Sequence, residues 1–189
     1  MGQVVPADEG REGGKTKSSP QESQASSKAK GEVMFEEDVE QNVLKIRQML
    51  RERQESVATA ESCTAGLVAY GLTSVAGSSD YFKQSWVLYA EDAKRFDFLM
   101  PLDIEVYSMK CARWLAKTSR EKARTNHGIG VTGLATTDNG RVWFAVNING
   151  EELFAMRLYA GDRNTIRRHA AADIIEFYKT TLHLNPKTE

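Results

Sequence analysis

The chain has little of what characterises disulfide-stabilised, metal-binding or membrane-embedded proteins. It contains 2 cysteines and 3 histidines among 189 residues. No Cys/His spacing resembles a zinc site, so we expect no structural metal, and Cys63 and Cys111 fit free thiols in a reducing compartment. No apolar run approaches the roughly 18 residues of a membrane span, and the start carries no apolar signal-peptide core. We therefore expect a cytoplasmic protein with no membrane partner.

A strong excess of charge of either sign is also lacking. The chain has 25 Lys and Arg against 26 Asp and Glu, which gives a formal net charge of −1. This balance argues against nucleic acid or an acidic macromolecule as partner. The hydrophobic content of 41% is enough for one core. A chain of this length fits one domain with an attachment.

The composition changes near residue 34. Residues 1–34 are rich in Gly, Ser, Lys, Glu and Gln and have few large apolar side chains. Such a segment buries too little surface to offset the entropy lost on ordering. We predict a disordered polar tail over residues 1–34, a folded domain over 35–184 and a short C-terminal tail over 185–189.

Hydrophobic spacing in the folded part predicts helices alternating with strands. Apolar residues three or four apart predict an amphipathic helix with a stripe of Val39, Val43, Ile46 and Leu50. Asn149-Gly150 is a strong hairpin signal between two strand-like runs. Further helices are expected over residues 62–74, 92–99 and 103–123 and from residue 163 onward. Asp103 is the expected cap of the helix over 103–123. Strands are expected over residues 56–60, 82–90, 128–133, 141–148 and 151–159. The fold class is therefore α/β, a single three-layer domain with helices packed on a mixed β-sheet that contains a β-hairpin.

The most informative segment is the turn between the first strand and the second helix. Ser62 lies in this turn, near backbone N–H groups that the helix leaves without partners. Such N–H groups can stabilise an oxyanion, and a sharp turn can expose a hydroxyl for attack. Helix N-capping by Ser62 or Thr64 is the structural alternative. Ligands of such sheets bind at the carboxyl ends of strands, where Ser62 can meet the segments after Ala90 and Thr132 and the turn at Gly161.

Six separated motifs resemble, in order and approximate spacing, those of the CinA carboxy-terminal family. The resemblance covers about Val39 to Leu182. The motifs are Thr59-Ala-Glu-Ser-Cys-Thr-Ala-Gly66, Val75-Ala-Gly-Ser-Ser79, Tyr89-x-x-x-Ala-Lys94, Val131-Thr-Gly133, Val142-Trp-Phe-Ala145 and Ala160-Gly-Asp-Arg163.

The resemblance implies hydrolysis of the carboxamide of nicotinamide mononucleotide to nicotinic acid mononucleotide and ammonia, in pyridine nucleotide salvage. It implies a Ser–Lys mechanism without metal or cofactor, in a homodimer. Ser62 matches the nucleophile and Lys94 the base, and Tyr89 completes the expected catalytic set. The substrate-binding residues expected beside them are Glu61, Thr64, Thr132, Gly133 and Arg163.

Each role has a requirement or an alternative. Lys94 can accept a proton near neutral pH only if desolvation or a nearby cation lowers its pKa. Glu91 stands where relatives have a different residue, and pairing with Lys94 would raise that pKa. We expect Cys63 to pack in the core rather than attack, and His127, His169 and His183 to be structural or exposed.

Two other functions remain open because the chain departs from the family pattern. The connection after Gly133 is much shorter than the glycine-rich loop of relatives, and Ala65 replaces a glycine. The first alternative is a catalytically silent relative that binds a nucleotide or a protein partner. A Ser–Lys amidase with a different amide substrate is the second alternative.

Overall fold

The computed structural model describes the backbone of residues 20–185 and the side chains from residue 37 onward. The chain divides into residues 1–33 and 34–189, and the fold described below is that of the second unit. Helix α1 runs over Pro20–Arg53. Over residues 20–34 the structure is therefore helical where the composition predicted a disordered tail, since Ala, Lys, Gln and Glu are good helix formers and proline suits the first helical position. Residues 1–19 and 186–189, the remainder of both expected tails, lie outside the described residues.

Five strands form one mixed sheet in the order β2-β1-β3-β4-β5. Strand β1 pairs in parallel with β2 and β3, whereas β3, β4 and β5 are antiparallel neighbours. The strands are β1 Val57–Glu61, β2 Phe82–Val87, β3 His127–Leu134, β4 Gly140–Ile148 and β5 Glu151–Tyr159. The expected hairpin is present, with Asn149 and Gly150 at positive φ between β4 and β5.

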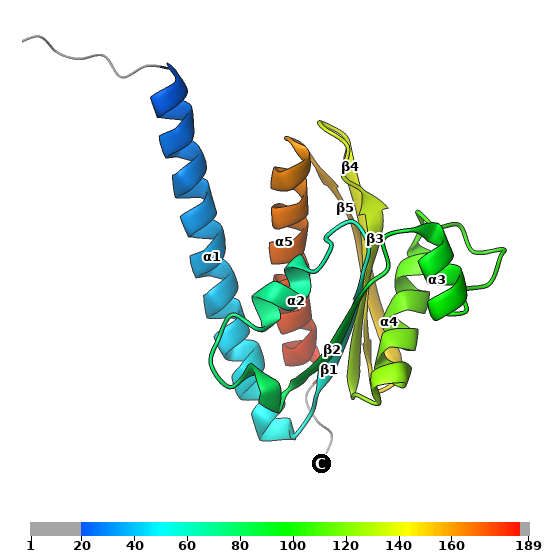
Figure 1. The fold of residues 1–189 in the computed structure, drawn as a ribbon. Coiled ribbons are helices and arrows are strands. Elements are labelled where there is room, and N and C mark those ends of the chain that lie inside the picture. The colour runs from blue at the N-terminus through cyan, green and yellow to red at the C-terminus, as the bar shows by residue number, and fades with distance from the viewer. Residues whose placement is uncertain (1–19, 186–189) are drawn as a thin grey trace, which may run out of the picture. The chain divides into compact units, whose positions relative to one another are not determined.

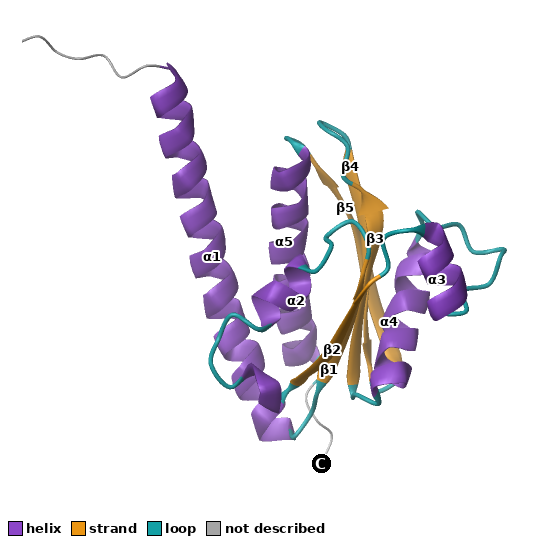
Figure 2. Cartoon of the chain, viewed as in Figure 1, coloured by secondary structure: helices purple, strands orange, loops and turns teal. Residues whose placement is uncertain are grey.

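Helices cover both faces of the sheet, which confirms the predicted three-layer α/β class (Figure 1, Figure 2). The part of α1 from residue 34 onward, α2 and α5 cover one face, and α3 and α4 cover the other. The remaining helices are α2 Leu67–Leu72, α3 Glu91–Asp97, α4 Met109–Ala123 and α5 Arg163–Leu184, with a short 3₁₀ turn at Ser78–Asp80.

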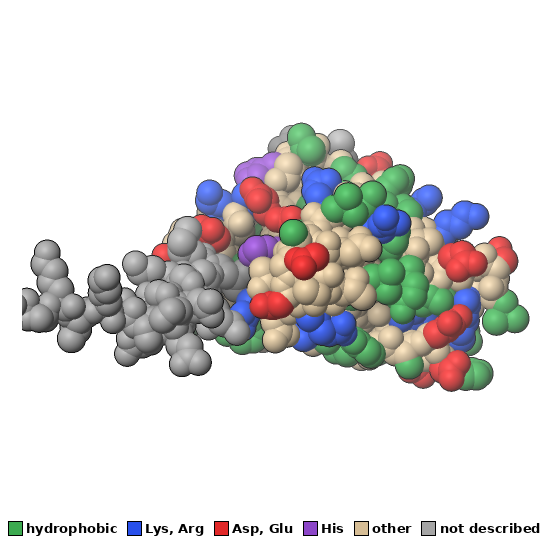
Figure 3. Space-filling model, turned by 90° about the horizontal axis from the view of Figure 1, so that it is seen from above, with side chains coloured by type: hydrophobic (Ala, Val, Ile, Leu, Met, Phe, Trp, Pro, Cys, Tyr) green, Lys and Arg blue, Asp and Glu red, His purple; other side chains and the backbone are tan. Residues whose placement is uncertain are grey.

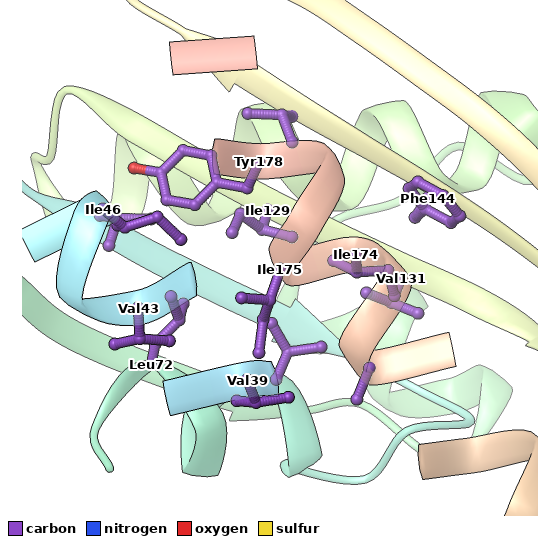
Figure 4. Packing of buried hydrophobic residues seen from close by; sticks show 14 of the residues in the cluster. Val39, Val43, Ile46, Leu72, Ile129, Val131, Phe144, Ile174, Ile175 and Tyr178 are labelled. Carbon is purple, nitrogen blue, oxygen red and sulfur yellow. The ribbon is translucent and has the colours of Figure 1, made fainter. Parts of the chain in front are cut away.

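The main core lies between the sheet and the layer of α1, α2 and α5. The predicted stripe of α1 is buried, with Val43, Ile46 and Leu50 fully inaccessible. Figure 4 shows Val43 and Ile46 near Leu72 of α2 and Ile175 of α5, in the same cluster as strand residues such as Ile129. These contacts hold α2, and with it the turn that precedes it, against the sheet.

Two glycines let α4 approach the other face closely. A Cβ on Gly128 would lie 2.0 Å from the carbonyl oxygen of Ala116, and one on Gly130 would lie 2.1 Å from that of Ala112. Any side chain at either position would push α4 away from β3. The N-terminus of α4 is thereby held close to the carboxyl end of β3.

Two expected helix starts are corrected by the structure. Helix α4 is capped by Ser108, whose hydroxyl accepts from the N–H of Cys111 at 3.1 Å, and not by Asp103. Helix α2 begins at Leu67 rather than residue 62, because Ala65 and Gly66 adopt positive φ of 50° and 94°. The second expected strand likewise ends at Val87 rather than at residue 90.

Candidate active site

The connections of the parallel strands leave the carboxyl end of β1 toward opposite faces of the sheet, and this switch point is called the crevice below. The chain leaves β1 over one face to reach β2, then crosses the other face to reach β3 on the opposite side of β1. Ligands of open α/β sheets bind where the strand order reverses in this way. Seen from above, hydrophobic side chains at this end lie next to charged side chains of both signs (Figure 3).

Glu61, the last residue of β1, caps helix α2. Its carboxylate is fully buried and accepts from the N–H groups of Gly66 at 2.9 Å, Val68 at 3.1 Å and Ala69 at 2.8 Å. A carboxylate suits this position because the N–H groups and the helix dipole both favour negative charge. The side chain expected to bind substrate is thus fully engaged by the protein.

Capping by Glu61 leaves the Ser62 and Thr64 hydroxyls out of the helix terminus, so the capping alternative for them is wrong. Ser62 is 4% exposed, and its N–H donates to the carbonyl of Val131 on β3 at 3.1 Å. The Thr64 hydroxyl is buried and has no hydrogen-bond partner in the described part of the chain. The turn therefore holds Ser62 and Thr64 in buried positions, where the sequence analysis expected an exposed hydroxyl.

Lys94, on α3, is the buried cation of the site. Its side chain is 1% exposed, and Nζ donates to the carbonyls of Tyr89 and Ala90, each at 3.4 Å. Burial lowers the Lys94 pKa below its ordinary value, more than the nearby thiols of Cys111 and Cys63 raise it. Desolvation thus shifts the Lys94 pKa in the direction that a lysine base requires.

The expected pairing of Glu91 with Lys94 is wrong. The Glu91 carboxylate accepts from Arg95 at 2.9 Å, one helical turn along α3. Its charge still raises the Lys94 pKa, but less than burial lowers it. The pKa of Lys94 is therefore lowered even though Glu91 replaces the residue found in relatives.

A main-chain hydrogen bond brings the Lys94 segment to the end of β1. The N–H of Leu88 donates to the carbonyl of Glu61 at 2.7 Å, which extends the pairing of β1 and β2 past the end of β2. The charge of Lys94 in turn lowers the pKa of Cys63, the neighbour of Ser62. Lys94 and the Ser62 turn are therefore within electrostatic reach of each other.

Tyr89 and Arg163 link three loops over the crevice. The Arg163 guanidinium donates to the Tyr89 hydroxyl and, at 3.1 Å, to the carbonyl of Ala135. Arg163 opens α5, where the carboxylate of Asp162 caps the first turn through N–H groups at 2.9 Å. Both Tyr89 and Arg163 are exposed residues.

Thr132 and Gly133 support the site from β3. The buried Thr132 hydroxyl donates to the carbonyl of Val106 at 2.7 Å, which fixes the loop before α4. A Cβ on Gly133 would lie 2.5 Å from the carbonyl oxygen of Arg141. The structure gives both residues contacts within the protein.

Arg167 is a site residue that the sequence analysis missed. Its guanidinium donates to the carbonyl of Thr64 at 3.2 Å and so holds the Ser62 turn from α5. Its Nε is buried without a hydrogen-bond partner in the described residues, as is the nearby Thr64 hydroxyl oxygen. Its spacing of four residues from Arg163, which places both on one helix face, was the available signal.

The short connection after β3 is ordered by the start of α5. It spans residues 135–139, and the N–H of Asp138 donates to the carbonyl of Gly161 at 3.0 Å. The Asp138 carboxylate accepts in return from the N–H of Gly161 at 3.3 Å. The loop and the N-terminal turn of α5 thus form one wall of the crevice.

The structure confirms the expectations for Cys63 and the histidines. Burial raises the pKa of the Cys63 thiol to about 12, so it is not a thiolate nucleophile. His127 is fully buried at the amino end of β3, while His169 and His183 are exposed.

Among the residues described, no group of three or more His, Cys, Asp or Glu side chains is arranged to hold a metal ion. No helix in the described part of the chain is long and apolar enough to span a bilayer.

Fold and crevice thus define an α/β domain with a polar site at the carboxyl ends of its parallel strands. The model of the CinA C-terminal domain family matches residues 31–182, so the chain belongs to this family. A CinA-like protein of Acidobacterium capsulatum is 34% identical over 159 residues, which cover 77% of this chain and 37% of the relative. The chain therefore spans little more than a third of the length of such relatives.

A shorter relative carries a more specific name. The nicotinamide-nucleotide amidohydrolase PncC of Escherichia coli K12 is 32% identical over 148 residues, which cover 67% of this chain and 84% of the relative. The crystal structure of the competence/damage inducible protein CihA of Agrobacterium tumefaciens superposes with a TM-score of 0.72 at 30% identity, covering 77% of this chain and 96% of that one. A crystal structure of a CinA superfamily protein of Klebsiella pneumoniae 700603 superposes with a TM-score of 0.74 at 21% identity. The match covers 78% of this chain and 99% of that one, and at this identity it supports the fold alone.

Proposed function

We propose that the chain hydrolyses the carboxamide of nicotinamide mononucleotide, giving nicotinic acid mononucleotide and ammonia. The observation that carries this proposal is the buried Lys94, with its lowered pKa, beside the turn that holds Ser62. The name of the E. coli relative supports the choice of substrate. The reaction would serve pyridine nucleotide salvage, in the cytoplasm.

In this mechanism the Ser62 hydroxyl attacks the amide carbon while neutral Lys94 accepts its proton. A lysine with a lowered pKa has a larger neutral fraction near pH 7 and is a better base there. The protonated Lys94 then gives its proton to the departing nitrogen, so ammonia leaves and an ester on Ser62 remains. Water attacks this ester with Lys94 again as base. The bond between the acyl carbon and the Ser62 oxygen then breaks, Lys94 returns the proton to that oxygen, and the acid product leaves.

Arg163 and Tyr89 are assigned to binding the nucleotide. Both groups are exposed over the crevice, and their hydrogen bond fixes the direction of the guanidinium. A guanidinium at a helix N-terminus suits a phosphate group. The exposed ring of Tyr89 can stack against the nicotinamide ring. Thr64 and the support residues Glu61, Thr132 and Gly133 keep the turn and the wall of the crevice in place.

The test is ammonia release from nicotinamide mononucleotide by the purified chain, with mass spectrometry of the nucleotide product. Ser62→Ala should abolish release while thermal stability is retained. Ser74→Ala, an exposed serine after α2, is the matched control and should keep wild-type turnover. If Ser62→Ala retains most of the turnover, the nucleophile assignment is wrong.

The five-residue connection after β3 is the observation that favours the alternatives. A chain that binds the mononucleotide without releasing ammonia would be a silent binder. Release of ammonia from another amide, dependent on Ser62 and Lys94, would keep the chemistry and change the substrate. We further propose that the chain acts as a homodimer, as the family resemblance implies.

A further inference from the structure

We infer that the free edge of β5 pairs, antiparallel, with β5 of a second copy of this chain. β5 is the last strand of the sheet order, so one side of its backbone has no partner strand in the described residues. It has nine residues, contains no proline and keeps a regular register with β4 throughout. Ordinary strands have about five or six residues, and a long edge without such interruptions is a template for another strand.

The opposite edge of the same sheet is protected. β2 has six residues, and its pairing with β1 shifts register between Val57 and Ala58. Exposed polar side chains, Lys83 and Gln84, also lie on this strand. Short length, irregular pairing and an exposed lysine are the usual means of blocking edge-to-edge association. The two edges of the sheet therefore differ in the features that govern pairing.

An apolar row runs along β5 on the same face of the sheet as α4, where it stays exposed. Phe154, Met156 and Leu158 are 47%, 42% and 66% exposed and, two residues apart, point to the same face. That face is the α4 side, because the guanidinium of Arg113 on α4 lies 5.1 Å from the centre of the Phe154 ring. Exposed apolar rows bordered by charged groups mark interaction surfaces.

The charges along β5 favour a second copy as the partner. A strand that pairs with itself across a two-fold axis must be antiparallel. Glu151 and Arg157, both exposed, lie at opposite ends of the strand and on the same face. With Phe154 on the axis, Glu151 lies opposite Arg157 of the partner subunit, and the symmetry repeats this pair. Opposite charges directly across a ladder stabilise pairing, whereas like charges there oppose it.

The proposal predicts a dimer whose stability responds to a charge swap. Sedimentation velocity of the full chain should show a dimer for the wild type. Glu151→Arg and Arg157→Glu should each weaken the dimer at least tenfold, because each places like charges opposite one another. The double variant Glu151→Arg/Arg157→Glu should restore wild-type association. Lys117→Glu, a charge reversal at an exposed position of α4, should have no effect.

Phe154→Lys is a second and independent variant, since it would bring two ammonium groups together on the axis. All these positions are exposed, so we expect every variant to fold, and circular dichroism checks this. A monomeric wild type at tens of micromolar, or a dimer that ignores the single reversals and Phe154→Lys, would overturn the proposal. So would a double variant that stays monomeric. The outcome does not depend on any amidase activity, so it is distinct from a failure of the proposed reaction.

Discussion

The carboxylate of Glu61 and the N–H of Gly66 are joined by a hydrogen bond of 2.9 Å that closes the turn around Ser62. The same carboxylate binds two further N–H groups of α2. One side chain of the first strand thus fixes the helix start and leaves the Ser62 hydroxyl unengaged by the helix. We expect Glu61 to act as a positioning residue rather than a ligand for the substrate.

Glu61→Gln should therefore lower both stability and turnover. The amide oxygen can replace one acceptor, but its NH₂ group would face backbone donors. Loss of charged hydrogen bonds in a buried cap should cost about 1–3 kcal/mol of unfolding free energy. Urea denaturation measures this loss, with the exposed Glu40→Gln of α1 as control. An unchanged KM with reduced kcat fits positioning, and a large rise in KM alone would contradict it.

Lys94→Met should abolish turnover without destabilising the fold. Methionine has a similar length and carries no charge, so it removes the cost of burying an amine that is 1% exposed. The free energy of unfolding should be equal to or higher than that of the wild type. A strongly destabilised variant would show that Lys94 has a structural role.

The pH dependence of turnover should reflect the lowered pKa of Lys94. Activity should rise with pH through this pKa, below the ordinary lysine value of about 10.4. Glu91→Gln removes a charge that raises the Lys94 pKa, so the rising limb should move to lower pH. A shift to higher pH would contradict this assignment.

The link between Tyr89 and Arg163 should affect binding more than chemistry. Arg163→Lys loses the planar fork that reaches both Tyr89 and Ala135, so KM for the mononucleotide should rise about tenfold or more. Arg168→Lys, on the same helix, is the comparison variant. Steady-state kinetics separates the two parameters, and a change confined to kcat would assign Arg163 to the chemical step.

Buried His127 should make stability fall in mild acid. Burial lowers its pKa to about 4, although the Glu55 carboxylate 3.1 Å away opposes the shift. Between an unfolded pKa of about 6.5 and the folded one, the unfolded chain binds the extra proton. The contribution is complete above about pH 6.5 and declines as pH falls, by at most about 1.4 kcal/mol per pH unit.

Urea midpoints at pH 7.5 and 5.0 measure this effect. His127→Gln should be less stable at pH 7.5, because it loses the 2.6 Å hydrogen bond with Tyr178, yet should show a smaller drop between the two pH values. An equal drop in both proteins would assign the acid sensitivity to other groups.

Periodicity and turn residues predicted most of the fold, because both act locally. The α1 stripe of Val39, Val43, Ile46 and Leu50 and the hairpin at Asn149 are as expected. Motif resemblance predicted that Ser62, Lys94, Tyr89 and Arg163 form one site, and this assignment stays a prediction. The helix starts were less predictable, since Asp103 and Ser108 are both good caps and tertiary packing selects between them.

The roles of individual polar groups could not be read from the sequence. The use of the Glu61 carboxylate depends on the backbone path over residues 62–66, and the pairing of Glu91 with Arg95 depends on which way α3 faces. The contact of Arg167 with the Thr64 carbonyl joins residues 103 positions apart. Such contacts are set by the assembled tertiary structure.

The two hydrogen bonds between Asp138 and Gly161 have a kinetic consequence. They tie the β3–β4 connection to the first turn of α5, so this segment is poorly suited to open and close as a lid. Substrate entry and product departure would then not depend on a motion of this segment. For a slow amide hydrolysis, turnover should be insensitive to added viscogen, because the chemical step alone sets the pace.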